Sequence, residues 1–223
     1  AARLPRETRE ADVTLRAAAA FSLLLGLTAL LAYVHALGEG LMVSREARHL
    51  RAMKLRRDAP AAPAPITFAA MESLPHYRPL AEYAPLERRG VVIEGYVQYV
   101  LRSVDGDTHF EVTADLPAPG SISNPYVTAE LTPEWYRGSS RWRYEKLLET
   151  ILPNGGGNVT AWGRDPRRVR LTGWLLYDFQ YDPVRDPERR APGATRLTGW
   201  EVHPVTRIEV WDDARGAFVE VPR

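Results

Sequence analysis

The sequence predicts a mainly-β chain, in which one small barrel domain follows a single membrane-spanning helix and a tether. Three observations lead to this fold class. Residues 17–37 form a run of twenty-one residues without a formal charge. Residues 58–65 read DAPAAPAP, a composition typical of an extended linker. From residue 89 onward, short stretches rich in strand-favouring residues are separated by turn residues, which indicates a β-rich domain.

The composition limits the classes to which the chain can belong. Its 223 residues leave room for one folded domain of ordinary size after the tail, span and tether. A formal net charge of +1 argues against a protein that binds polyanions through its overall charge. The absence of cysteine excludes disulfides, thiolate metal ligands and cysteine nucleophiles.

The uncharged run at residues 17–37 has the length of a membrane span. At about 1.5 Å per residue, a helix here is about 31 Å long, close to the hydrocarbon core of a bilayer at about 30 Å. We therefore predict a tail over residues 1–16 and an uncleaved anchor after it. The alternative is a signal peptide cleaved after residues 34–36, although the run exceeds the usual signal core of about 7–15 residues. Ser22 and Gly26 give the span a small-residue face that another helix could approach closely.

Basic residues flank the predicted span on both sides. Residues 1–16 contain four arginines and residues 38–58 contain six arginines and lysines, so the positive-inside rule places the C-terminal domain in the cytoplasm by a small margin. We predict a basic juxtamembrane helix over residues 38–57. Its basic residues recur at every third position, at Arg45, Arg48, Arg51 and Lys54. Such a stripe would face anionic lipid headgroups or an acidic partner surface; the alternative is a solvated face.

Residues 58–88 are predicted to be a proline-rich linker. Each proline fixes φ and removes a hydrogen-bond donor, which favours an extended, semi-rigid chain. Apolar side chains, Phe68 and Tyr77 among them, are scattered between the prolines. We expect these side chains to pack either on the protein's own domain or on a partner.

The β-rich domain is predicted to occupy residues 89–223. Strands are expected at residues 90–101, 108–114, 126–131, 159–163, 168–178 and 200–211. Asp105-Gly106 marks the turn of a hairpin between the first two strands. Thr132 and Pro133 mark a helix start.

One amphipathic helix is predicted before Pro153. Tyr144, Leu147, Leu148 and Ile151 recur at helical spacing there. A hairpin, a third strand, a helix and further strands follow one another in the order of a small OB-like Greek-key barrel.

Two segments resemble a group of small bacterial OB-like domains. TGWLLYD at residues 172–178 is similar to their tGxLhhD strand, and WEVHPV at residues 200–205 is similar to their WEhHP strand, where h is an apolar residue. The resemblance covers at most residues 90–210 and implies a fold but no activity. Members are commonly exported, which would place the domain in the periplasm, against the charge bias. Members often carry a histidine soon after the aspartate, whereas Asp178 is followed by Phe-Gln-Tyr.

Four residues are candidates for a divalent-metal site, since imidazoles and carboxylates are common metal ligands. They are His109, Asp178, Glu201 and His203. Their spacing does not require them to converge. The sequence favours the interpretation without a metal, in which His203 bonds a backbone group at the sheet edge and Trp200 covers the core.

Residues 135–144 interleave aromatic residues with arginines. Such a cluster could stack single-stranded bases, although the near-neutral charge of the chain makes nucleic acid an unlikely partner. Trp135 and Trp142 could equally anchor a protein interface.

The motifs of known enzyme classes are not found. The sequence has no serine elbow, no recognisable pair of catalytic carboxylates and no dinucleotide fingerprint, and residues 155–157 lack the lysine and hydroxyl of a phosphate-binding loop. We therefore predict no enzymatic activity and no cofactor.

The sequence instead predicts an accessory or structural subunit of a larger bacterial membrane complex at the inner membrane. A photosynthetic reaction centre and antenna or a respiratory assembly would be examples. The predicted partner-binding residues are Ser22, Gly26, Arg45, Arg48, Arg51, Lys54, Phe68, Tyr77, Trp135 and Trp142. The alternatives are a membrane-anchored metal-binding or small-ligand-binding domain, and a single-stranded nucleic-acid binding domain.

Overall fold

A computed structural model describes residues 44–121, 123–153, 160–162, 165–183 and 195–223. The chain divides into two compact units, residues 1–48 and residues 49–223. The predicted tail and span, with Ser22 and Gly26, lie outside the described residues. Within the described ranges, no helix combines the length and the apolar character needed to cross a bilayer.

The described elements are short helices and longer strands. The first part of the chain contains α2 (Arg45–Lys54), β1 (Ala64–Pro65), α3 (Phe68–Glu72), α4 (Leu80–Tyr83) and a 3-10 turn, η1 (Leu86–Arg88). The barrel strands and the elements between them are β2 (Gly90–Arg102), β3 (Thr108–Thr113), β4 (Tyr126–Leu131), α5 (Pro133–Tyr136), α6 (Tyr144–Ile151), β5 (Thr160–Trp162), β6 (Arg168–Tyr177), η2 (Phe179–Tyr181), β7 (Trp200–Asp212) and β8 (Ala217–Glu220).

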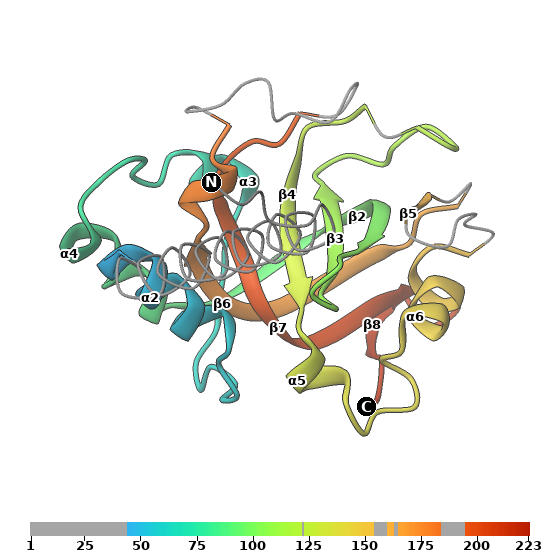
Figure 1. Ribbon diagram of the computed structural model, residues 1–223. Coiled ribbons are helices and arrows are strands. Elements are labelled where there is room, and N and C mark those ends of the chain that lie inside the picture. Colours follow the sequence, from blue (N-terminus) through green and yellow to red (C-terminus); the bar gives the residue numbers. More distant parts are fainter. Residues whose placement is uncertain (1–43, 122, 154–159, 163–164, 184–194) are drawn as a thin grey trace, which may run out of the picture. The chain divides into compact units, whose positions relative to one another are not determined.

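Five strands close into a barrel, which confirms the predicted mainly-β fold class (Figure 1). The order around the barrel is β2, β3, β4, β7 and β6, and β6 pairs with β2 to close it. All of these pairs are antiparallel except β4 with β7, which is parallel. The short strands β1 and β8, which the sequence analysis did not predict, extend β2 and β7 at the margins.

The long strand β2 takes part in two pairings and must bend between them. Its first half, Gly90 to Tyr96, pairs with β6, and its second half pairs with β3, with an irregularity between Val97 and Tyr99. At Gly95 an added Cβ would lie 2.3 Å from the carbonyl oxygen of Thr113. Glycine is therefore required where the two partner strands meet, because only a residue without Cβ permits this approach.

Residues 58–88 belong to the folded domain and do not form a linker. Ile66, Met71 and Tyr83 are buried in the main hydrophobic core, and Phe68 packs against it. The indole nitrogen of Trp200 donates to the carbonyl oxygen of Pro75 at 3.0 Å. The apolar side chains between the prolines thus pack on the barrel itself, which is the physical reason that this segment is ordered.

The short helices after β4 follow the predicted pattern, with Tyr144, Leu147 and Ile151 of α6 buried. The two tryptophans predicted as partner anchors are buried within the domain. Trp142 is 1% exposed and donates to the carbonyl oxygen of Val221 at 2.9 Å. Trp135 is 8% exposed and donates to the carbonyl oxygen of Arg56 at 3.0 Å.

The other predicted partner residues differ in exposure. Tyr77 is 40% exposed, and Arg45, Arg48 and Arg51 lie exposed on α2. Lys54, the fourth member of the predicted basic stripe, is instead directed into the barrel domain, where it pairs with buried carboxylates. The stripe that α2 presents to its surroundings therefore consists of three arginines.

Candidate functional site: a buried acidic cluster on the barrel

Strand alternation sorts the side chains of β3, β4 and β7 into two faces. Successive side chains of a strand point to opposite sides of the sheet. One set lies in the core and comprises Phe110, Val112, Val127, Ala129, Leu131, Trp200 and Val202. The other set lies on the outer side of the barrel and comprises His109, Glu111, Thr128, Glu130, Glu201 and His203. The register places His109 opposite Glu130 and Glu111 opposite Thr128.

This outer set is polar but is removed from solvent. Glu111 and Glu130 are 4% and 2% exposed, and Glu201 and His203 are fully buried. Carboxylates are rarely buried in proteins unless a cation or hydrogen bonds compensate them. The partners of each buried carboxylate therefore determine what the face can bind.

Two permanent cations each compensate one carboxylate. The Lys54 ammonium lies 2.7 Å from Asp178 Oδ2 and 3.9 Å from Glu130 Oε2. The Arg196 guanidinium forms an ion pair with Glu201. Glu111 has a neutral partner, since the Thr128 hydroxyl donates to its Oε2 at 2.8 Å.

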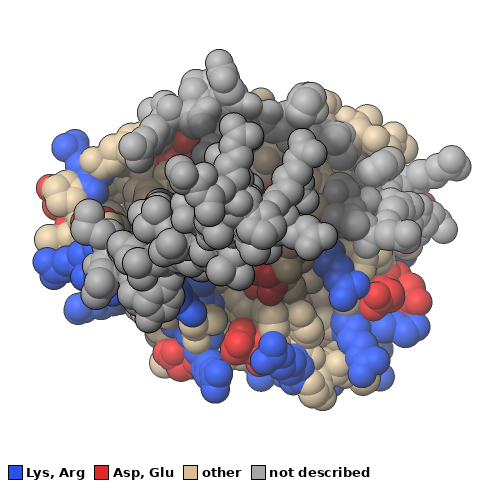
Figure 2. All heavy atoms as spheres, viewed as in Figure 1, with Lys and Arg blue, Asp and Glu red and all other residues tan. Residues whose placement is uncertain are grey.

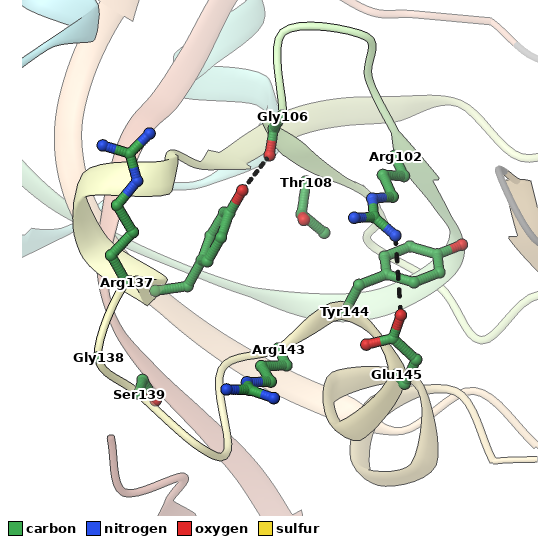
Figure 3. A pocket seen from close by; sticks show the side chains of 10 residues that line it. Arg102, Gly106, Thr108, Arg137, Gly138, Ser139, Arg143, Tyr144 and Glu145 are labelled. Carbon is green, nitrogen blue, oxygen red and sulfur yellow. Dashed lines mark hydrogen bonds and ion pairs between the residues drawn. The ribbon is translucent and has the colours of Figure 1, made fainter.

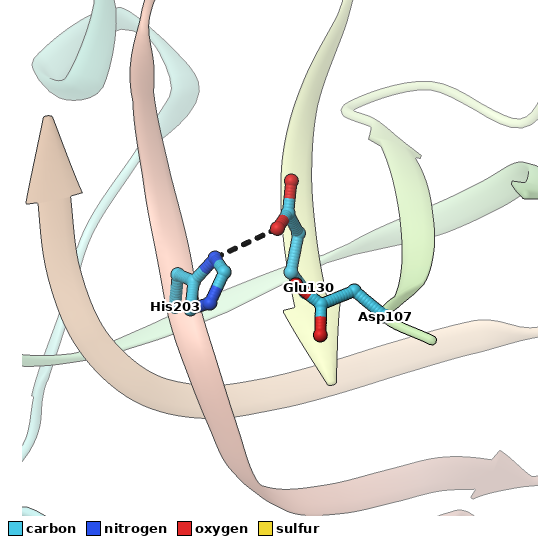
Figure 4. A group of neighbouring side chains, drawn as sticks. All are labelled: Asp107, Glu130 and His203. Carbon is cyan, nitrogen blue, oxygen red and sulfur yellow. Dashed lines mark ion pairs between the residues drawn. The ribbon is translucent and has the colours of Figure 1, made fainter. Parts of the chain in front are cut away.

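His203 on β7 faces Glu130 on β4 (Figure 4). Its Nδ1 is 2.8 Å from Glu130 Oε2 and 3.4 Å from Glu201 Oε2, an ion pair without the direction of a good hydrogen bond. Its Nε2 is buried without any hydrogen-bond partner. On the other side of Glu130, His109 Nδ1 lies 3.5 Å from Oε1.

The charges in this cluster shift one another's pKa values strongly. Burial alone lowers the pKa of His203, but Glu130 and Glu201 outweigh it and raise this pKa to about 10. Burial raises the pKa of Glu130, but the positive charges of His203 and His109 outweigh it and hold this pKa well below its usual range. Glu130 therefore remains an anion in the folded protein.

The other carboxyl groups are shifted in the opposite direction. Burial raises the pKa of Asp107 to about 6 and that of Glu111 to about 7. Burial and repulsion from Glu201 raise the pKa of Asp178, although Lys54 opposes this. Negative charge in the cluster is thus present in excess and only partly compensated, a condition that favours binding of a cation.

The four predicted metal-site residues lie around Glu130, which the sequence analysis did not predict as a site residue. His109 and His203 flank Glu130, Glu201 contacts His203, and Asp178 joins through Lys54. His203 is fully buried and faces carboxylates, which contradicts the favoured prediction of a backbone contact at a sheet edge.

Asp107, Glu130 and Lys54 were not assigned to this site from the sequence. Asp107 has the parity of His109 on β3, and this was the available signal for it. Glu130 lies on β4, which carried no predicted site residue, and the strand register places it opposite His109. One ligand atom from each of Asp107, Glu130 and His203 lies within 4.8 Å of the other two.

A cavity of about 380 Å³ beside the β2–β3 turn is a weaker candidate (Figure 3). Its rim includes Arg102, Arg143 and Glu145, and the Tyr136 hydroxyl donates to the carbonyl oxygen of Gly106 across it at 2.9 Å. Arg102 and Glu145 are 55% and 69% exposed and lie 3.7 Å apart. Solvent screens these exposed groups, so they would attract a charged ligand less strongly than the buried charges of the acidic cluster would.

No family model matches the chain, and no curated protein matches it.

Proposed function

We propose that this chain is a membrane-anchored, OB-type barrel protein that serves as an accessory subunit of a larger bacterial membrane complex. The strand order supports the OB type. Numbered along the chain, the five barrel strands follow one another as 1-2-3-5-4-1, with a parallel pair between the third and the fifth and a helix between the third and the fourth. A five-stranded Greek-key barrel with this arrangement is typical of OB domains.

The pairing of β6 with β7 supports the resemblance to small bacterial OB-like domains. The segment TGWLLYD includes the end of β6, and the segment WEVHPV begins β7. These two ends pair directly, Leu176 with Glu201 and Tyr177 with Trp200. The two similar segments therefore form one continuous patch of sheet, as a shared fold would require.

The exposed arginine stripe on α2 is the observation that carries the accessory role. Arg45, Arg48 and Arg51 are three residues apart, so they lie along one side of the helix, and all three are exposed. They follow the predicted span, which ends at residue 37, by 8, 11 and 14 residues. A basic residue this close to a bilayer contributes about 1 kcal/mol of attraction to anionic lipid. An acidic surface on a neighbouring subunit would be attracted in the same way.

The nucleic-acid alternative has less support. OB domains that bind oligonucleotides use the face of their second and third strands. In this barrel those strands are β3 and β4, whose outer side chains include Glu111 and Glu130. Carboxylates on that face would repel phosphates. Basic and acidic side chains are also interspersed over the described part of the surface in Figure 2, so that view shows no basic groove.

Co-purification from native membranes tests the proposal. The full chain, tagged after Arg223, would be extracted in a mild detergent, and we expect it to elute with a larger complex in fixed stoichiometry. Replacing Arg45, Arg48 and Arg51 by glutamine should reduce this association. A matched control replaces the exposed Arg78, Arg88 and Arg89 by glutamine, removing the same charge outside α2. A wild-type chain that elutes alone would overturn the proposal. A reporter fused after Arg223 would decide between a cytoplasmic and a periplasmic domain.

A further inference from the structure

Two carboxylates near His203, those of Glu130 and Asp107, are left without a permanent cation of their own. Lys54 lies closest to Asp178 and Arg196 pairs with Glu201, so these carboxylates are compensated within the chain. Glu130 has only the two histidines and the more distant Lys54 at 3.9 Å. Asp107 is 7% exposed, and its carboxylate has no hydrogen-bond or ion-pair partner among the described residues.

The buried Nε2 of His203 points independently to a missing ligand. This residue is fully buried, yet Nε2 has no hydrogen-bond partner. A buried polar atom left in this state costs about 1–3 kcal/mol, so proteins rarely retain one without a reason. Figure 4 shows the imidazole on β7 converging with the carboxylates of Glu130 on β4 and Asp107 just before β3. A ligand located between the three groups would satisfy the ring nitrogen and the acid excess together.

The donor set selects the class of ligand. Magnesium and calcium ions prefer oxygen ligands alone, whereas one imidazole nitrogen with two carboxylate oxygens suits first-row transition metals. In a four-coordinate site with bonds of about 2.1 Å, ligand atoms lie about 3.4 Å apart. The three ligand atoms already lie within 4.8 Å of one another, so small side-chain rotations would close the site.

We propose that Asp107, Glu130 and His203 bind a divalent first-row transition metal ion, with His203 supplying the nitrogen ligand. The metal ion replaces the proton of the imidazolium ring, which is released to solvent, because only a neutral imidazole can donate a lone pair to a metal. The ion is held by the β2–β3 turn and by the strands β4 and β7, so it also crosslinks these three segments. Lys54 lies near Glu130 and Glu201 lies near His203, and Asp178 and Arg196 pair with Lys54 and Glu201 in turn. The site does not depend on the accessory role proposed above.

Manganese binding to the full chain in mild detergent tests the site. The protein would first be freed of metal with a chelator, and Mn²⁺ would then be titrated while the signal of the free ion is followed by electron paramagnetic resonance. We expect one saturable site per chain. His203→Gln and Asp107→Asn should each weaken binding at least about tenfold, because loss of a ligand exceeds the effect of losing a group that only orients one. Pulsed spectra of the wild-type complex should show coupling of Mn²⁺ to a ¹⁴N nucleus.

Glu111→Gln is the matched control, since Glu111 is a buried carboxylate on the same face but bonds Thr128 and is not one of the three ligands. Glu111→Gln should change the Mn²⁺ affinity less than about threefold, because it removes only a charge that lies outside the site and is screened from it. The absence of saturable binding, or an equal loss in Glu111→Gln and His203→Gln, would overturn the proposal. If the ligand variants fail to fold, the ¹⁴N coupling in the wild type decides, and its absence rejects His203 as a ligand.

Discussion

Replacing Lys54 by methionine tests whether a fixed internal cation stabilises the acidic cluster. The ammonium lies 2.7 Å from Asp178 Oδ2 and 3.9 Å from Glu130 Oε2, and these two side chains are 0% and 3% exposed. Methionine keeps an unbranched side chain of similar length but removes the charge. Loss of one partner of a buried ion pair costs about 3–5 kcal/mol. Because the Lys54 side chain is 26% exposed, water screens part of this, and we expect a loss of about 2–3 kcal/mol at pH 8.

The stability loss of Lys54→Met should depend on pH, and the protonation of Asp178 determines the direction of that dependence. Burial and the negative charge of Glu201 already raise the pKa of Asp178, and Lys54 opposes the shift. Without Lys54 this pKa rises further, so the carboxyl takes up a proton at a higher pH in the folded than in the unfolded chain. A group with a raised folded-state pKa favours folding at low pH, and the benefit is lost as pH rises through that pKa. The deficit of Lys54→Met should therefore shrink between pH 8 and pH 5.

Urea denaturation of the full chain in mild detergent, at both pH values, provides the measurement. Arg51→Met is the matched control, because it removes a charge from the exposed side of the same helix and should cost less than about 0.5 kcal/mol. Adding Asp178→Asn to Lys54→Met removes both charges and should recover at least half of the loss at pH 8. Equal stability of Lys54→Met and Arg51→Met at pH 8, or a deficit that is the same at both pH values, would refute the reasoning.

Two further substitutions test other parts of the domain with the same denaturation assay. Burial raises the pKa of Glu111 from 4.5 to about 7, so its contribution to stability is fully present below pH 4.5 and is lost as pH rises through 7. Relative to the wild type, Glu111→Gln should therefore gain up to about 3 kcal/mol between pH 5 and pH 8, and parallel pH profiles would contradict this. Met71→Ala should cost about 2–5 kcal/mol, because Met71 is fully buried against the barrel, whereas Leu55→Ala, at a side chain that is 50% exposed, should cost less than about 0.5 kcal/mol. Equal losses would show that residues 58–88 do not contribute to the core.

The strands of the barrel could be predicted because their signals are local. Tyr126 to Leu131 has the same bounds in the structure as in the sequence prediction, and the amphipathic spacing located α6. Residues 58–88 have no period of their own, since prolines interrupt every stretch. These residues are held in place by packing against the folded barrel, so their structure could not be predicted from the segment alone.

The members of the acidic cluster were harder to predict because strand pairing is not local. The parallel pairing of Ala129 with Val202 places Glu130 next to His203, although 73 residues separate them in the sequence. Because basic residues recur at every third position of α2, the sequence analysis predicted that Lys54 lies in one exposed stripe with the arginines. Its position in the last turn instead allows it to reach Asp178, a contact that depends on where the barrel lies against that turn.

The distribution of charge separates two roles within the proposed OB-type barrel. The strand face that such domains use for phosphate-rich ligands carries carboxylates here, and two of the cluster's carboxylates already have internal cations in Lys54 and Arg196. A polyanion would have to displace these pairs and accept the repulsion of Glu130, whereas a small cation would relieve it. The exposed arginines of α2 have the opposite sign, so they attract polyanions instead of repelling them. We therefore infer that attraction to lipid or to a partner subunit lies on α2, and that the strand face binds a cation inside the domain.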